Sequence, residues 1–173
     1  MSKVQLLVDD FKIVSADESI LGTDNSESLF GEVGDDTIFG KGGNDQLFGS
    51  EGMNTLYGGA GDDTMYGGSQ ADMMYGGFGN DLIFAAEGDN VVFGGSGDDT
   101  IYSGSGNDKI DGGFGNDIIW LGGGEDIVVL ETGNGIDTIN NFQLGQTTFD
   151  VSDNFDELSI VDGANGAEIS QFG

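Results

Sequence analysis

Acidic side chains occupy ten of twelve positions spaced nine residues apart in the middle of this chain, and they offer its clearest chemistry. The sixth position of a nine-residue frame that begins at Gly22 is Glu27, Asp36, Asp45, Asn54, Asp63, Asp72, Asp81, Asn90, Asp99, Asp108, Asp117 and Asp126. Carboxylate and carbonyl oxygens are hard ligands that suit calcium. Because the sequence has no histidine and no cysteine, the ligands that zinc and copper prefer are missing. We therefore expect these position-six side chains to bind several calcium ions.

The composition points the same way and excludes other partners. The chain has 173 residues, 32 of them acidic and four basic, and its formal net charge is −28. A chain of this charge repels nucleic acid and anionic lipid, so we expect no nucleic-acid partner. High charge with 34 glycines suggests disorder by composition alone, but here the glycines are periodic. Periodic glycine favours an ordered repeat structure.

The sequence offers few residues that could catalyse a reaction. No histidine or cysteine is present to act as base or nucleophile. The glycine runs lack the lysine that accompanies a phosphate-binding loop. The carboxylates of the repeats are better explained as metal ligands, so we expect no enzyme and no catalytic residues.

The same nine-residue frame also predicts the strands and loops that could position these carboxylates. It holds for twelve units, up to residue 129. The eighth position is always aliphatic, as Leu29, Ile38, Leu47, Leu56, Met65, Met74, Ile83, Val92, Ile101, Ile110, Ile119 and Val128. Positions seven to nine read as a three-residue strand whose eighth side chain points inward. Glycines at positions one, two and four permit positive φ and close backbone approach. Each loop reverses the chain, so units 18 residues apart become neighbours in one parallel sheet, about 4.8 Å apart.

Three units match the pattern G-G-x-G-x-D-x-U-x in full, namely residues 58–66, 76–84 and 94–102. The chain resembles the repeats-in-toxin (RTX) family of calcium-binding nonapeptide repeats. The resemblance implies an all-β fold, a parallel β-roll (a right-handed β-helix of two parallel sheets) with N- and C-terminal caps. We expect an N-terminal cap over residues 1–21, the roll over 22–139 and a C-terminal cap or flank over 140–173.

The resemblance also implies the ligands. Each calcium ion would lie between two loops on the same side, held by backbone carbonyls and by the position-six aspartates of units n and n+2. The implied metal ligands are Asp36, Asp45, Asp63, Asp72, Asp81, Asp99, Asp108, Asp117 and Asp126, with Gly43, Gly61, Gly79, Gly97 and Gly115. Five intervals on each side limit the number of ions to about ten.

Alternate units form two columns of unequal quality. The first column, the units that begin at residues 22, 40, 58, 76, 94 and 112, has an acidic residue at every sixth position. The second column, which begins at residue 31, contains Asn54 and Asn90 and loses glycine at Ser50, Gln70 and residues 85–86. Asparagine removes a charge from a site that depends on ligand charge. We expect calcium throughout the first column and weak or empty sites in the middle of the second; the alternative is that carbonyls suffice and both columns fill.

Aromatic residues occupy most ninth positions and form a ladder of Phe30, Phe48, Tyr66, Phe84, Tyr102 and Trp120. The ladder could stack against sugars, a flat partner or a second copy; alternatively, the rings stack on one another and shield the backbone. Position seven becomes apolar toward the C-terminus, from Ser28 and Thr37 to Ile118 and Ile127. The apolar outer face predicts a cover, either the chain's own tail or another subunit through self-association.

The segments that flank the repeats are expected to contain short strands. Before the repeats these are residues 4–8 and 11–14. The frame breaks after Val129, the aspartate pattern resumes two residues late at Asp137, and residues 149–151 and 158–161 are strand-like.

Two functions remain for such a chain. The first is a module that folds on binding calcium outside the cell, in a secreted or cell-surface protein; the resemblance implies type I secretion for such proteins. The second is a calcium-stabilised adhesion or ligand-binding module that uses the aromatic ladder, with an unknown surface ligand. An ice-binding face would need a regular threonine array, which position three does not provide.

Overall fold

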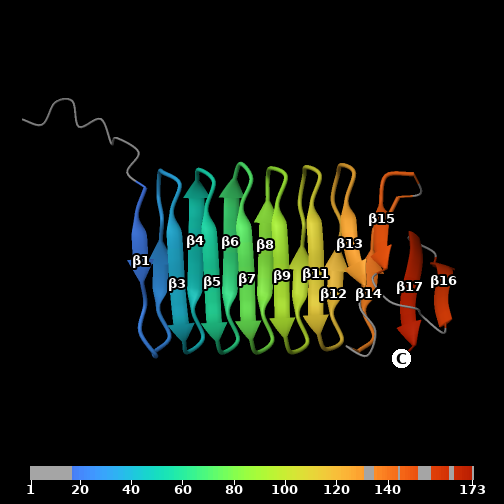
Figure 1. Cartoon of the computed structure of the whole chain (residues 1–173), viewed down its shortest axis with the longest axis horizontal. Coiled ribbons are helices and arrows are strands. Elements are labelled where there is room, and N and C mark those ends of the chain that lie inside the picture. The colour runs from blue at the N-terminus through green and yellow to red at the C-terminus, as the bar shows by residue number, and fades with distance from the viewer. Residues whose placement is uncertain (1–16, 131–134, 144, 152–156, 164–165, 173) are drawn as a thin grey trace, which may run out of the picture.

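The computed structural model describes residues 17–130, 135–143, 145–151, 157–163 and 166–172, the last two ranges through their backbone alone. All regular elements in these ranges are strands, which Figure 1 shows stacked along the long axis of the molecule. Over the same part of the chain, no helix is long and apolar enough to cross a membrane. The strands expected at residues 4–8 and 11–14 lie outside the described residues.

Strands of odd and even number form two separate parallel sheets. The eight-stranded sheet contains β1 (Ser19–Leu21), β3 (Thr37–Gly42), β5 (Thr55–Ala60), β7 (Met73–Phe78), β9 (Val91–Ser96), β11 (Lys109–Phe114), β13 (Ile127–Leu130) and β15 (Thr148–Val151). The seven-stranded sheet contains β2 (Ser28–Phe30), β4 (Gln46–Glu51), β6 (Thr64–Ser69), β8 (Leu82–Ala86), β10 (Thr100–Tyr102), β12 (Ile118–Trp120) and β14 (Thr138–Asn140). The predicted all-β roll of two parallel sheets is therefore confirmed.

The pairing register follows the nine-residue repeat. Ile38 pairs with Leu56, and Leu56 pairs with Met74, which places residues 18 apart side by side. The same spacing holds in the other sheet, where Leu47 pairs with Met65. Ser19–Leu21 pairs with β3 over the same spacing, so parallel pairing begins before the first unit recognised in the sequence.

Position-eight side chains fill the space between the sheets, as predicted. Eleven of them are exposed by 1% or less: Ile38, Leu47, Leu56, Met65, Met74, Ile83, Val92, Ile101, Ile110, Ile119 and Val128. Leu29 is partly buried and packs against this core, because β2 is the outermost strand of its sheet. A fully buried side chain of this size contributes about 1.5–3 kcal/mol. No single unit could bury its own aliphatic residue, so the repeats stabilise one another.

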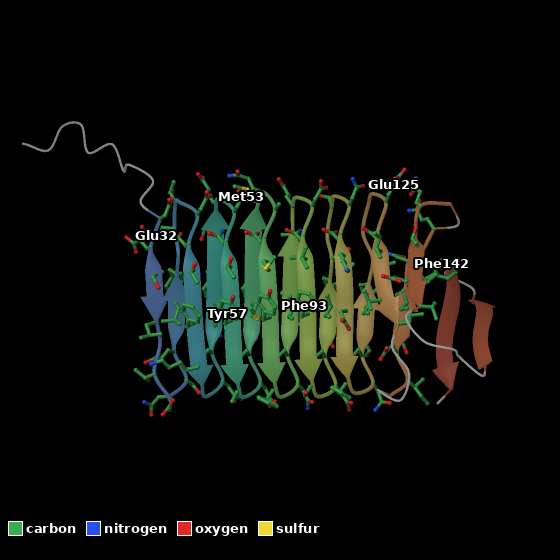
Figure 2. The ribbon with its side chains drawn as sticks, viewed as in Figure 1. Glu32, Met53, Tyr57, Phe93, Glu125 and Phe142 are labelled. Carbon is green, nitrogen blue, oxygen red and sulfur yellow. The ribbon has the colours of Figure 1, made fainter. Side chains whose placement is uncertain are left out.

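The loops lie along two opposite edges of the roll. The loops of the first column lead from the eight-stranded to the seven-stranded sheet, and we call their line the first edge; it is the lower edge in Figure 1. The loops of the second column lead back and form the second edge. Figure 2 shows Met53 and Glu125 along this second, upper edge.

Beyond Trp120 the repeat length increases while the pairing continues. Ile119 pairs with Ile139, a spacing of 20 residues, which confirms the late return of the pattern at Asp137. Thr148–Val151 then pairs with β13 and extends the eight-stranded sheet. An antiparallel hairpin of β16 (Glu157–Gly163) and β17 (Gly166–Phe172) follows, and β17 contacts β14 at this end of the roll.

The aromatic rings of position nine stack face to face. In the seven-stranded sheet, the rings from Phe30 to Tyr102 have centroids 4.7–5.0 Å apart and planes within 8°. A second stack runs from Phe39 to Phe93 on the other sheet, as Tyr57 and Phe93 in Figure 2 indicate. The interpretation that the rings stack on one another is confirmed. Inside each stack the ring faces cover one another, so mainly ring edges remain exposed.

Candidate metal sites

Ten of the twelve loops turn at two positions of the repeat that have positive φ; residues 22–27 include no such position and residues 121–126 include only Gly124. Position two is positive at Gly59, Gly77 and Gly95 (113–116°), and position four is positive at Gly61 and Gly79 (120–128°). Position one is not among the residues of positive φ, which differs from the sequence-based expectation. Its glycine is needed for a different reason, namely the close approach of oxygen atoms described below.

The position-six side chains form a buried ladder along the first edge. Each backbone N–H donates to the Oδ1 atom of the aspartate one turn further on, from Asp45 to Asp63 at 2.7 Å and from Asp63 to Asp81 at 2.8 Å. The series continues through Asp99 to Asp117. These carboxylates are exposed by 2% or less. The backbone thus holds one oxygen of every aspartate and fixes the direction of the other.

The second oxygen of each first-edge aspartate from Asp45 to Asp117 has no hydrogen-bond partner. Buried Oδ2 atoms without a partner occur at Asp45, Asp63, Asp81, Asp99 and Asp117 on this edge, and at Asp36, Asp72 and Asp108 on the second. A buried charged oxygen without a partner is costly. Buried, unpartnered oxygens that recur once per turn are suited to bind a row of cations.

Backbone carbonyls converge on the same places. A methyl group on Gly58 would lie 2.5 Å from both Asp63 Oδ2 and Gly76 O, and Gly76 and Gly94 show the same arrangement at 2.4–2.5 Å. No side chain fits such a space. The donor set, carboxylate and carbonyl oxygen, is the one that calcium prefers. The residues present therefore fit calcium at each turn of the first edge.

The predicted glycine ligands also form a line. Gly61, Gly79, Gly97 and Gly115 each approach the carbonyl oxygen of the position-four glycine one turn earlier, the first of these being Gly43. Within the described residues no three acidic side chains converge on one point. Coordination here would rest on the position-six carboxylates together with carbonyls. The assignment of individual ligands stays a prediction.

The carboxylates of the ladder are hard to ionise without a cation. Burial raises the pKa of Asp63 to about 6, of Asp81 and Asp117 to about 7, and of Asp99 to about 8. Neighbouring carboxylates, such as Asp81 and Asp117 beside Asp99, raise the pKa further, while the backbone N–H donors lower it. Burial also raises the pKa of Asp72 and Asp108 on the second edge, to about 6. A bound calcium ion would supply the positive charge that favours the ionised form.

The predicted second-edge ligands Asp36, Asp72, Asp108 and Asp126 share one ladder with two asparagines. The N–H of Asp36 donates to Asn54 Oδ1, and that of Asn54 to Asp72 Oδ1. The asparagine amide then makes a contact that a carboxylate cannot make. Asn54 Nδ2 donates to Gly52 O at 3.2 Å, and Asn90 Nδ2 donates to Gly88 O at 3.0 Å. In these two loops an N–H group satisfies the position-four carbonyl.

Two residues that were not among the predicted ligands, Asp137 and Glu18, also join the ladders. Asp137 Oδ1 accepts a hydrogen bond from the N–H of Asp117, so the first-edge ladder continues past the break in the frame. Glu18 donates its N–H to Asp36 Oδ1 and is the start of the second-edge ladder. The aspartate-x-aliphatic pattern around Asp137 carries this signal. That around Glu18 is weaker, because Ile13, Val14 and Ala16 stand at the positions where the frame has glycine.

Position five forms a second, outer ladder that the sequence did not reveal. The N–H of Asp62 donates to Asn44 Oδ1, and that of Asn80 to Asp62 Oδ1. The series continues through Asp98 to Asn116. These hydrogen bonds run opposite in direction to those of position six. Neutral and charged side chains alternate, which avoids adjacent like charges at the exposed rim.

Stacked parallel strands and oxygen-lined turns define a β-roll built from calcium-binding loops. The family model described as RTX calcium-binding nonapeptide repeat (4 copies) matches residues 21–52, 48–83, 75–110, 84–119, 93–128 and 102–139, together more than half of the chain. The chain belongs to the RTX calcium-binding nonapeptide repeat family. It is therefore a calcium-binding repeat module. No curated protein matches the chain.

Proposed function

We propose that this chain is a module that folds on binding calcium outside the cell, in a secreted protein. The observation that carries the proposal is the row of buried, unpartnered Oδ2 atoms on the first edge, from Asp45 to Asp117. Without cations these oxygens oppose folding, because desolvated carboxylates one turn apart repel one another. With cations the same oxygens become ligands, so the free energy of metal binding becomes free energy of folding.

The net charge supports a switch between two compartments. At −28 the chain repels itself, and at low calcium this repulsion adds to the cost of burying the ladder. Extracellular calcium modules have dissociation constants of about 10⁻⁴ to 10⁻³ M, far above the calcium concentration of a cytosol. An unfolded chain inside and a folded chain outside suit export through a type I secretion system, in which RTX proteins take part according to the resemblance.

The adhesion alternative receives less support from the aromatic ladder. Sugars stack on open ring faces, but Phe48, Tyr66 and Phe84 each have neighbouring rings within 5.0 Å on both faces. A ligand for this surface would have to bind ring edges or an end of the stack. The outer faces of both sheets also remain candidates for self-association, since Met73 and Ile127 of the eight-stranded sheet and Ile118 of the seven-stranded sheet are exposed by 39–41%. We propose no catalytic activity, because the carboxylates of the ladder are better used as ligands.

Circular dichroism with light scattering, in calcium-stripped buffer and across a calcium titration at neutral pH, tests the proposal. We expect an expanded, disordered chain without calcium and a compact β spectrum with calcium, with a midpoint near 10⁻⁴ to 10⁻³ M. A compact β-roll in calcium-stripped buffer would overturn the proposal. The light-scattering mass reports in the same experiment whether the apolar face forms a dimer.

A further inference from the structure

The second edge changes character at its fourth loop, between β8 and β9, where glycine disappears from position one. The loops that begin at residues 31, 49 and 67 start with glycine, as do all first-edge loops. The next three second-edge loops start with Ala85, Ser103 and Leu121. All three side chains are buried, with exposures of 0–2%. We call these three loops, which end at Asn90, Asp108 and Asp126, the closed half-edge.

Side-chain atoms of the closed half-edge take the space that glycine leaves open elsewhere. At Gly94 on the first edge, a methyl group would lie 2.4 Å from Gly112 O and 2.5 Å from Asp99 Oδ2. Those two oxygens are the ones that converge on a cation. Ala85, Ser103 and Leu121 carry carbon atoms at the equivalent position, and Ala85 and Leu121 pack into the apolar core.

The chain itself satisfies several polar groups of this half-edge, although Asp108 Oδ2 is buried without a hydrogen-bond partner. Asn90 Nδ2 donates to Gly88 O at 3.0 Å. Ser103 Oγ accepts a hydrogen bond from the N–H of Gly122 at 3.1 Å. Asn90 lies between Asp72 and Asp108 in the ladder: its Oδ1 accepts from the N–H of Asp72, and its own N–H donates to Asp108 Oδ1. Unlike these two aspartates, Asn90 carries no charge. The open space at position one is thus missing from all three loops, and Asn90 also removes the carboxylate pair from the interval between the loops of Asn90 and Asp108.

We propose that the closed half-edge binds no calcium, so that the C-terminal half of the roll is cross-linked by calcium on its first edge alone. This inference rests on the proposed calcium-dependent folding and specifies which loops take part in it. It also shifts the expected gap in the second column from its middle to its C-terminal half. Hydrogen bonds and packed side chains hold the loops there in place of metal ions.

Asp99 and Asp108 provide a matched pair for the test. They occupy position six of adjacent units on opposite edges, and each is exposed by 1%. Asp99→Asn and Asp108→Asn remove the same charge with almost no change in shape. Bound calcium per chain is measured by equilibrium dialysis with elemental analysis, and the calcium midpoint of folding by circular dichroism. We expect Asp99→Asn to lose bound calcium and to raise the midpoint, and Asp108→Asn to leave the count unchanged.

A gain-of-site variant tests the same idea without removing any ligand. Ala85→Gly, Asn90→Asp and Ser103→Gly together give this interval the residue types of Gly76, Asp81 and Gly94 on the first edge. We expect the triple variant to bind one additional calcium ion per chain. An unchanged count in the triple variant, or an equal loss of calcium in Asp99→Asn and Asp108→Asn, would overturn the inference alone. A wild-type chain that binds no calcium would overturn the proposed function as well.

Discussion

The two edges of the roll share one backbone path and differ in what closes their loops. On both edges the position-six N–H donates to the side chain one turn further on. The first edge repeats aspartate from Asp45 to Asp117 with glycine at every first position, and its unpartnered oxygens recur without interruption. The second edge alternates aspartate with Asn54 and Asn90 and ends in the closed half-edge. The comparison favours calcium along the whole first edge, and hydrogen bonds and packed side chains in the closed half-edge of the second.

Backbone strain follows the same division. Glu32, Ser50, Gln70 and Ala86 are second-edge residues with side chains at positive φ, whereas Lys41 is the first-edge counterpart. Each such residue costs about 1–2 kcal/mol relative to glycine. Four of these five residues thus lie on the second edge, which departs from glycine at positions two and four more often than the first edge does.

The largest effect is expected from removing charge on one edge at a time. The variant Asp63→Asn/Asp81→Asn/Asp99→Asn should need at least about tenfold more calcium to fold, or fail to fold, because site strength depends on ligand charge. The matched variant Asp36→Asn/Asp72→Asn/Asp108→Asn loses the same net charge on the second edge. We expect its midpoint to shift by less than about threefold. Circular dichroism across a calcium titration measures both, and equal shifts would contradict the comparison.

A smaller effect is expected from pH in calcium-stripped buffer. Burial raises the pKa of Asp81 to about 7 and of Asp99 to about 8, above the value of about 3.9 in an unfolded chain. The folded state then binds more protons than the unfolded state, so its stability falls as pH rises. We expect some compact β structure near pH 5, lost between about pH 6 and 8.

Matched variants separate this effect from net charge. Asp81→Asn/Asp99→Asn should weaken the pH dependence between about pH 6 and 8. Asp62→Asn/Asp98→Asn removes two carboxylates from the exposed position-five ladder on the same edge. This variant should leave the pH dependence unchanged. Far-UV circular dichroism against pH provides the measurement. Identical profiles for the two variants would show that overall charge, and not the buried ladder, sets the dependence.

The smallest effect is expected from relieving strain on the second edge. Gln70 replaces the position-four glycine at a φ of 76°, so Gln70→Gly should stabilise the calcium-loaded roll by about 1 kcal/mol. Ser69→Gly, at a neighbouring position that does not have positive φ, is the control and should give no gain. Urea unfolding at saturating calcium measures the difference. On the first edge, Lys41→Gly should stabilise the roll by a similar amount, because Lys41 also has a positive φ.

The repeat made much of this structure predictable from sequence. The aliphatic eighth position placed the core and the two sheets, because a strand of three residues has one inward side chain. The spacing also placed the position-six ladder. The sequence could not distinguish two reasons for a glycine. Gly59 is required because its φ is positive, whereas Gly58 is required because oxygen atoms approach it closely.

Other features depend on contacts between turns. The position-five ladder alternates Asn44, Asp62 and Asn80, a pattern that becomes meaningful only once loops 18 residues apart lie side by side. Asp137 joins the first edge although two extra residues precede it. Ala85 was read from the sequence as a loss of the leading glycine, and the structure places it in the apolar core together with Leu121.

Anomalous diffraction from crystals grown in calcium tests the account most directly, because it locates the ions between particular loops. We expect a row of peaks along the first edge, each about 2.3–2.6 Å from carboxylate and carbonyl oxygens, between the loops of Asp45, Asp63, Asp81, Asp99 and Asp117. No peak should lie between the loops of Asn90, Asp108 and Asp126. An equal row on both edges, or no peaks along the first edge, would contradict the account.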